Sequence, residues 1–185
     1  MDGGGKIMLK PALLFKDQLE SKFIETAYEE KYKYYVSNNY VDFELNLQRD
    51  SWTAIEFVSI DKDNNLLGFL GARIDRNSNS VSSLSVINFY DVNYTFSKDF
   101  RQFLDDLLFK FNFNKIKFSV VVGNPAEKMY DKYVEHYGGR IVGIFKEHVV
   151  LTDNHYYDWK TYEVFRKDVL NKRDKKGATN SGVEV

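Results

Sequence analysis

Residues 123–143, GNPAEKMYDKYVEHYGGRIVG, carry a complete helix signal directly after an apolar strand. Asn124 is a favoured N-cap, Pro125 fits the first helical position because its missing N–H would be unpaired there, and Glu127 completes a reciprocal capping pair. The Gly-Gly pair near the end supplies a left-handed stop. Apolar and tyrosine residues recur between these signals at three- and four-residue steps, on one helix face: Ala126, Met129, Tyr130, Tyr133, Val134 and Tyr137.

Length and composition indicate a single domain. A chain of 185 residues is long enough to close one substantial core. Its 26 Lys and Arg balance 27 Asp and Glu, so no overall basic field attracts DNA or an anionic membrane. Cysteine is absent, which excludes disulfides and thiolate metal sites and favours a cytoplasmic location. No apolar run approaches the roughly 20 residues that span a bilayer.

Both ends of the chain offer little to bury. Residues 1–5 contain three glycines and are expected to form a flexible leader. Residues 171–185, NKRDKKGATNSGVEV, are expected to form a mobile tail. The folded domain is therefore predicted to span residues 6–170.

Hydrophobic periodicity predicts the elements of the first half of the domain. A short strand at 6–10 leads into a helix at 16–36. Strands rich in apolar and β-branched residues follow at 53–60, 66–74 and 83–89, separated by polar turns. Three consecutive strands of this kind predict an antiparallel meander.

The second half of the domain alternates strands and helices. Ser97 is expected to cap a helix whose apolar face extends to Phe111, and residues 115–122 form a buried strand before the helix described above. Strand candidates for the end of the domain lie at 140–145, 149–151 and 160–165. The order β-α-β-β-β-α-β-α-β-β predicts an α/β (α+β) fold on a mixed sheet with at least one parallel crossover.

This order, together with residues 123–143, resembles the GNAT superfamily of acyl-CoA N-acyltransferases. In that family the strand before the last helix commonly ends at an Asn, an Ala follows, and a Tyr one turn later lies close to the thioester sulfur. Asn124, Ala126 and Tyr130 occupy these places, although Asn124 is one residue nearer the Ala than is usual. The element order matches over 6–170 and the residues over 83–165. The resemblance implies a central sheet that splays open.

One feature of the family is missing. Its members usually carry a turn of the form Arg/Gln-x-x-Gly-x-Gly/Ala after the fourth strand, and its N–H groups hold the cofactor pyrophosphate. Residues 90–100, YDVNYTFSKDF, contain no glycine. A helix N-terminus still offers unpaired N–H groups, so Thr95, Ser97 and Lys98 are expected to meet the phosphates, with Arg101 adding charge. Weaker, altered or lost cofactor binding is the alternative, because glycine permits closer approach.

The resemblance implies that acetyl-CoA is the acyl donor, as a cosubstrate, and that an amine attacks it directly. Ile87, Asn88 and Phe89 would pair with the pantetheine amides in the manner of an added strand. Asn124 would contact the cofactor, although its role as an N-cap is a sufficient explanation of its presence.

Two further roles are implied. Tyr130 would protonate or stabilise the thiolate that leaves, with Tyr133 in reserve, whereas the pattern alone describes a core aromatic. Asp91 is the first candidate for the base that deprotonates the amine and Glu56 the second, and each is also explained as a solvated or paired carboxylate. Water is another proton acceptor. The three histidines are dispersed and no metal site is expected.

The acceptor is not specified beyond a small-molecule or peptide amine, and either a monomer or a homodimer is compatible with the sequence. The run EEKYKYY, residues 29–35, is expected to form a lid or a wall of the acceptor pocket. Two other functions stay open. A GNAT fold kept as an inactive binding or assembly module would explain the missing glycines, and an RNA-modifying transferase would need a local basic face.

Overall fold

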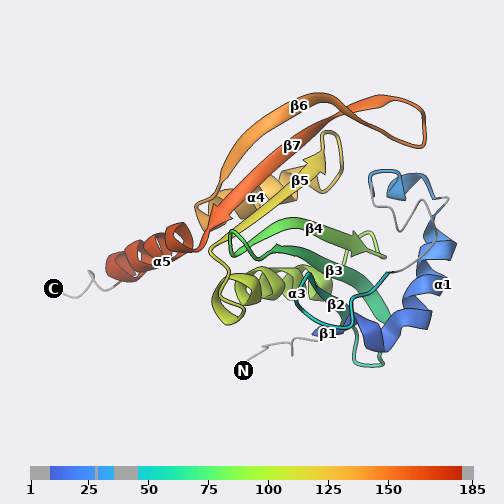
Figure 1. Cartoon of the computed structure of the whole chain (residues 1–185), viewed down its shortest axis with the longest axis horizontal. Helices are drawn as coiled ribbons and strands as arrows, with labels where there is room; N and C mark the ends of the chain where they lie inside the picture. Colours follow the sequence, from blue (N-terminus) through green and yellow to red (C-terminus); the bar gives the residue numbers. More distant parts are fainter. Residues whose placement is uncertain (1–8, 28, 36–45, 181–185) are drawn as a thin grey trace.

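The computed structural model describes residues 9–27, 29–35 and 46–180 (Figure 1). The expected leader and the start of strand 6–10 lie outside the described residues. The predicted order of strands and helices is confirmed, with short 3₁₀ turns (η1, η2), a π-helical turn (η3) and one C-terminal helix added. The elements are β1 (Leu9–Pro11), η1 (Ala12–Phe15), α1 (Lys16–Thr26), η2 (Glu30–Tyr32), β2 (Ala54–Ile60), β3 (Leu66–Asp75), β4 (Ser80–Asn88), α3 (Tyr94–Asp105), η3 (Asp106–Lys110), β5 (Lys115–Val121), α4 (Glu127–Tyr137), β6 (Arg140–Val150), β7 (Tyr156–Phe165) and α5 (Arg166–Asn180).

The seven strands form one mixed sheet in the order β1-β2-β3-β4-β5-β7-β6. The strands β2, β3 and β4 make the predicted antiparallel meander, and the β4–β5 contact is parallel, as the crossover required. Neighbouring residues of β3 face opposite sides: Phe69 packs with Phe23 of α1, whereas Leu70 belongs to the core formed with Phe103 of α3 and Val134 of α4. The two faces of the sheet are therefore covered by different helices.

The sheet splays open between β4 and β5. These strands are paired only at Ser80 with Lys115 and at Val81 with Ile116. Beyond these two pairs they diverge (Figure 1), while β5 stays paired with β7 over its whole length. The splayed sheet implied by the family resemblance is confirmed, and the C-terminal half of β4 is left with an unpaired edge.

Helix α3 begins one turn earlier than expected. Its N-cap is Asn93, whose Oδ1 accepts the Phe96 N–H at 3.0 Å. The Ser97 N–H donates to the Asn93 carbonyl at 3.0 Å, so the prediction of Ser97 as the cap was wrong. The earlier start is stabilised by Phe96, because its buried ring packs directly over Gly68 of β3.

Helix α1 is shorter than the predicted helix at 16–36. It ends at Thr26, where Oγ1 bonds back to the Lys22 carbonyl at 2.8 Å, and the short η2 turn follows. Helical spacing continues in the sequence, but Tyr32 and Tyr35 instead contact Asn88 at the end of β4. Tyr32 is also buried in a core with Phe23 and Phe69, and this burial outweighs the local helical preference. The predicted end at Val36 lies outside the described residues.

The start of α4 is also shifted, by two residues: its N-cap is Ala126 instead of the predicted Asn124. Asn124 Oδ1 accepts the Ala126 N–H at 2.8 Å, and Glu127 Oε2 accepts the Gly123 N–H at 2.9 Å. Each side chain therefore bonds the residue next to its expected partner, and the predicted capping pair itself does not form. Gly138 ends the helix in the left-handed region, with φ of 75°, as predicted.

The last three predicted strands form two long strands. Residues 140–145 and 149–151 belong to the single strand β6, apart from Leu151, and are interrupted by a bulge at Glu147. Helix α5 follows β7 and contains residue 170, where the domain was expected to end. Val169 is buried in the core and Arg173 Nη2 lies 2.7 Å from Asp105 Oδ1 of α3, so α5 packs on the domain.

Candidate active site

Two adjacent cavities lie where β4 and β5 separate. One has a volume of about 300 Å³ and the other about 100 Å³. Residues from the segment 29–35, from β4 and from the start of α4 line both of them: Tyr34, Tyr35, Val86, Asn124, Ala126 and Tyr130. Tyr130, the residue expected to protonate or stabilise the thiolate of CoA, therefore lies where the two cavities meet.

Tyr130 is held by packing against two other aromatic rings. It lies in the first turns of α4 with 8% of its surface exposed. Its ring makes edge contacts with Phe100 of α3 at 6.0 Å and Phe118 of β5 at 5.5 Å between centroids. Among the described residues its hydroxyl has no hydrogen-bond partner. Burial raises the pKa of Tyr130, so the phenol stays neutral and can donate a hydrogen bond to developing negative charge.

The register of β4 determines which of its amides face the gap. The Phe89 N–H donates to the Leu67 carbonyl of β3 at 3.1 Å. The N–H and C=O groups of successive residues point to opposite edges of an antiparallel strand, so those of Ile87 also pair with β3. Those of Val86 and Asn88 point to the other edge, into the gap between β4 and β5. Of the three residues expected to pair with pantetheine, only Asn88 offers its backbone there, and Val86 was missed. Knowledge of the β3–β4 register was needed to find it.

Two tyrosine hydroxyls contact the Asn88 backbone from the segment 29–35. Tyr32 donates to the Asn88 carbonyl at 3.5 Å, and the Asn88 N–H donates to the Tyr35 hydroxyl at 3.4 Å. Both bonds are longer than a good protein hydrogen bond and are correspondingly weak. A ligand amide can therefore replace them at little cost.

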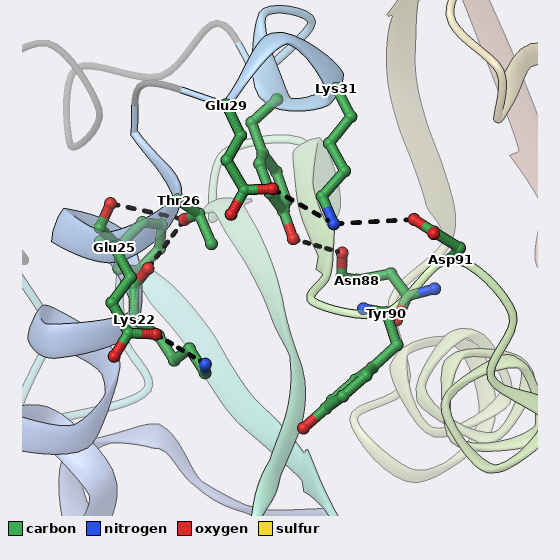
Figure 2. Close-up of polar contacts among 10 residues, drawn as sticks. Lys22, Glu25, Thr26, Glu29, Lys31, Asn88, Tyr90 and Asp91 are labelled. Carbon is green, nitrogen blue, oxygen red and sulfur yellow. Dashed lines mark hydrogen bonds and ion pairs between the residues drawn. The ribbon is translucent and has the colours of Figure 1, made fainter.

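The structure brings one of the two candidate bases to the cavity. Asp91 lies at the rim of the larger cavity, 86% exposed, with Oδ1 3.6 Å from Lys31 Nζ. Figure 2 shows Lys31 between Asp91 and Glu29, whose Oε2 is 3.3 Å away. Glu56 lines neither cavity: its carboxylate accepts the Gln48 N–H at 2.8 Å, and burial raises its pKa. Lys31 was not anticipated as a site residue.

Because α3 begins at Tyr94, the residues expected to bind phosphate lie in its first turns, and only some of them line a cavity. Ser97 lines the larger cavity, but its N–H is used inside α3. Thr95 and Lys98 are exposed and lie outside the cavity lining. The N–H groups of Tyr94 and Thr95 bond to no backbone carbonyl in the described part of the chain, as is usual for a first helical turn. Asn124 lines both cavities, with its Oδ1 engaged by Ala126.

The segment 29–35 forms a wall of both cavities and is fastened to the turn between β6 and β7. Lys33 Nζ lies 2.7 Å from Glu30 Oε1 and 3.1 Å from Asp153 Oδ2. Tyr157 donates to the same Asp153 oxygen at 2.6 Å. The wall is therefore held by residues more than one hundred positions away.

Solved acetyltransferases share this arrangement of sheet and helices. A chimera of spermidine N-acetyltransferase SpeG from Vibrio cholerae and hSSAT matches with a TM-score of 0.67 and 23% identity, over 88% of this chain and 97% of that chain. This chain has the GNAT fold. The Vibrio cholerae spermidine N-acetyltransferase in complex with CoA and spermine matches at 0.68 and 19% identity, over 88% and 96% of the two chains.

Another GNAT-fold structure, the dodecameric spermidine N-acetyltransferase from Vibrio cholerae in an intermediate state, matches with a TM-score of 0.57 and 23% identity. It covers 66% of this chain and 70% of that chain. No protein-family model and no curated protein sequence matches this GNAT-fold chain. None of the helices in its described part has the length and apolar character needed to cross a membrane.

Proposed function

We propose that this protein is an N-acetyltransferase that transfers the acetyl group of acetyl-CoA to an amine. The observation that carries the proposal is the gap between β4 and β5, with Tyr130 in the lining of both of its cavities. A GNAT-fold neighbour in complex with CoA and spermine supports a CoA thioester as the donor. It also makes spermine and spermidine the first acceptors to test.

The residues around the gap fit acetyl-CoA as a substrate. The backbone groups of Val86 and Asn88 can pair with the pantetheine amides, as in the addition of a strand to a sheet edge. The free N–H groups of Tyr94 and Thr95, with the positive end of the α3 dipole, can receive a phosphate. Lys98 lies one turn further along the same helix.

The proposed reaction is direct attack on the thioester. The amine nitrogen forms a bond to the acetyl carbon, the carbon–sulfur bond breaks through a tetrahedral intermediate, and CoA leaves as the thiolate. Tyr130 donates a hydrogen bond to the sulfur as its charge develops. The proton that the ammonium loses before attack goes to Asp91, at the rim of the larger cavity, or to water. The second proton, which the nitrogen loses after attack, passes through solvent and balances the charge of the departing CoA thiolate.

The remaining parts of the proposal are a cytoplasmic location, a single domain, which α5 extends beyond the expected end at residue 170, and a monomeric or homodimeric state. The sequence favours the location because it contains no cysteine. The alternative function is that of a binding module without transferase activity, which would explain why residues 90–100 contain no glycine.

A calorimetric titration with acetyl-CoA, followed by thiol release assays with spermine, spermidine, simple monoamines and a peptide, tests the proposal. Binding heat, a raised melting temperature and amine-dependent thiol release are expected. No heat and no thermal shift at millimolar acetyl-CoA would exclude the enzyme and favour the binding module. Binding without turnover of any acceptor would also contradict acetyl transfer to these amines.

A further inference from the structure

Lys160 of β7 is a buried lysine that the proposed reaction does not use. Only 8% of its surface is exposed. Strand alternation places its side chain with that of Tyr162 on the α4 face of the sheet, whereas the Thr161 hydroxyl bonds Ser119 of β5. A buried ammonium requires compensating carboxylates, because the charge has lost its hydration.

Two acids of α4 supply that compensation. Lys160 Nζ lies 2.7 Å from Asp131 Oδ1 and 3.1 Å from Glu127 Oε1. Burial acts to lower the pKa of Lys160, but these carboxylates outweigh it and raise the pKa, so the lysine remains charged. Tyr162 adds a second bond to α4 by donating to Asp131 Oδ1 at 2.7 Å.

The two acids bracket the position of Tyr130. Glu127 is the first residue of α4 and Asp131 directly follows Tyr130, so one ammonium holds the helix on either side of the phenol. The remaining Glu127 oxygen accepts the Gly123 N–H at 2.9 Å and fixes the approach to the helix. The ring of Phe118, which packs on Tyr130, stacks on Tyr162 at 5.0 Å. Polar and aromatic contacts thus connect β7 to the phenol.

We propose that Lys160 is a positioning residue, which acts through Glu127 and Asp131 to hold the Tyr130 hydroxyl at the gap between β4 and β5. This inference rests on the proposed function, because the position of the hydroxyl matters only if Tyr130 takes part in acetyl transfer. Hydrophobic burial alone would keep α4 on the sheet but would allow it to slide or rotate. The paired charges are directional, and they specify one position along β7.

The test compares Lys160→Met, which keeps the aliphatic volume, with Lys160→Arg, which keeps the charge. For the methionine variant we expect a fall in kcat of about 10- to 100-fold, with KM for acetyl-CoA within about threefold, because small misplacements of a reacting group are costly. Arginine is expected to restore much of kcat. Lys172→Met is the matched control: Lys172 also bonds a carbonyl of α4, that of Glu135, but at the far end of the helix.

A double-mutant cycle and a spectroscopic measurement separate positioning from a general loss of stability. If Lys160 acts through the phenol, Lys160→Met combined with Tyr130→Phe should be no slower than Tyr130→Phe alone. The ring ¹³C NMR signal of Tyr130, assigned from its loss in Tyr130→Phe, should shift or broaden in Lys160→Met and stay unchanged in Lys172→Met.

The positioning role would be overturned if the kcat loss of the double mutant equalled the product of the two single losses, or if the Tyr130 signal did not move. Neither result would contradict the proposed acetyl transfer. If the wild-type protein acetylates no amine, the proposed function fails. The NMR comparison then still decides whether Lys160 holds Tyr130.

Discussion

At the scale of single residues, the Tyr130 hydroxyl carries the proposed chemistry and its ring carries the packing. Tyr130→Phe keeps the contacts with Phe100 and Phe118 and removes only the oxygen. We expect kcat to fall by about 100-fold, the lower range for loss of a hydrogen bond to developing negative charge, with KM for acetyl-CoA little changed. Steady-state kinetics at saturating acceptor measures both constants.

Tyr133→Phe is the control for this substitution. Tyr133 lies on the same helix and also contacts Phe100, at 5.4 Å, but lines neither of the two cavities at the gap. Its variant should retain kcat. Equal losses in both variants would indicate that the phenol at position 130 has no special role.

Gly68 on β3 is required because the ring of Phe96 and the backbone of β4 approach it closely. An added Cβ would lie 2.3 Å from Phe96 Cε2 and 2.4 Å from the Ile87 carbonyl oxygen. Gly68→Ala is therefore expected to lower the free energy of unfolding by about 1–3 kcal/mol through overpacking. Denaturant unfolding measures this, with Gly143→Ala as the control, since nothing lies within 4 Å of its added Cβ. Equal stabilities of the two variants would contradict the account.

At the scale of elements, the segment 29–35 depends on its attachment to the β6–β7 turn. Hydrogen bonds from Tyr157 and from the His155 N–H, together with the ammonium of Lys33, lower the pKa of Asp153 to about 2, from its ordinary 3.8. The folded-state pKa is depressed, so the stabilisation is complete above about pH 4 and is lost as the pH falls toward 2.

Asp153→Asn should therefore be less stable than the wild type at about pH 6, and the difference should disappear as the pH falls from about 4 to 2. Urea unfolding midpoints at a series of pH values measure it. Asp63→Asn, in the turn between β2 and β3, is the control because Asp63 takes part in none of the described ion pairs. A difference that stays constant down to pH 2 would show that the ionised carboxylate is not what holds the segment.

At the scale of the whole molecule, the sheet consists of two parts joined edge to edge by only two residue pairs. The helices α3 and α4 complete the connection through a shared core, in which Phe100 meets Tyr130. Such a construction leaves space for an extended ligand to pair with β4 without breaking the core.

Hydrogen exchange can detect a ligand in this space. Acetyl-CoA should slow exchange of the Val86 and Asn88 amides, which face the gap, and leave the Ile87 amide little changed because it already pairs with β3. NMR-detected exchange with and without acetyl-CoA distinguishes the three neighbouring amides. Protection of Ile87 alone, or of none of them, would contradict strand-like binding at this edge.

Much of this architecture could be read from local patterns. The apolar stripes of α3 and α4, the polar turns between β2, β3 and β4, and the left-handed stop at Gly138 all depend on residues close in sequence. Their order predicted the mixed sheet and its splay through the resemblance to the GNAT superfamily. The expected place of Tyr130 beside the thioester also came from that resemblance, because the helix pattern alone described a core aromatic.

Long-range contacts determined features that local patterns did not predict, among them the bounds of two helices. The end of α1 was set by the burial of Tyr32 against Phe23 and Phe69, and the start of α3 by the close packing of Phe96 on β3.

The register of β4 on β3 determines that the backbone N–H of Asn88, and not that of Ile87, faces the gap. The pairing of Lys160 with Asp131 joins residues 29 positions apart. The sequence by itself determined which residues must be buried and in which elements, because hydrophobic periodicity is a local property. Only the tertiary structure decided which backbone groups and charges meet, because register and long-range pairing depend on the whole sheet.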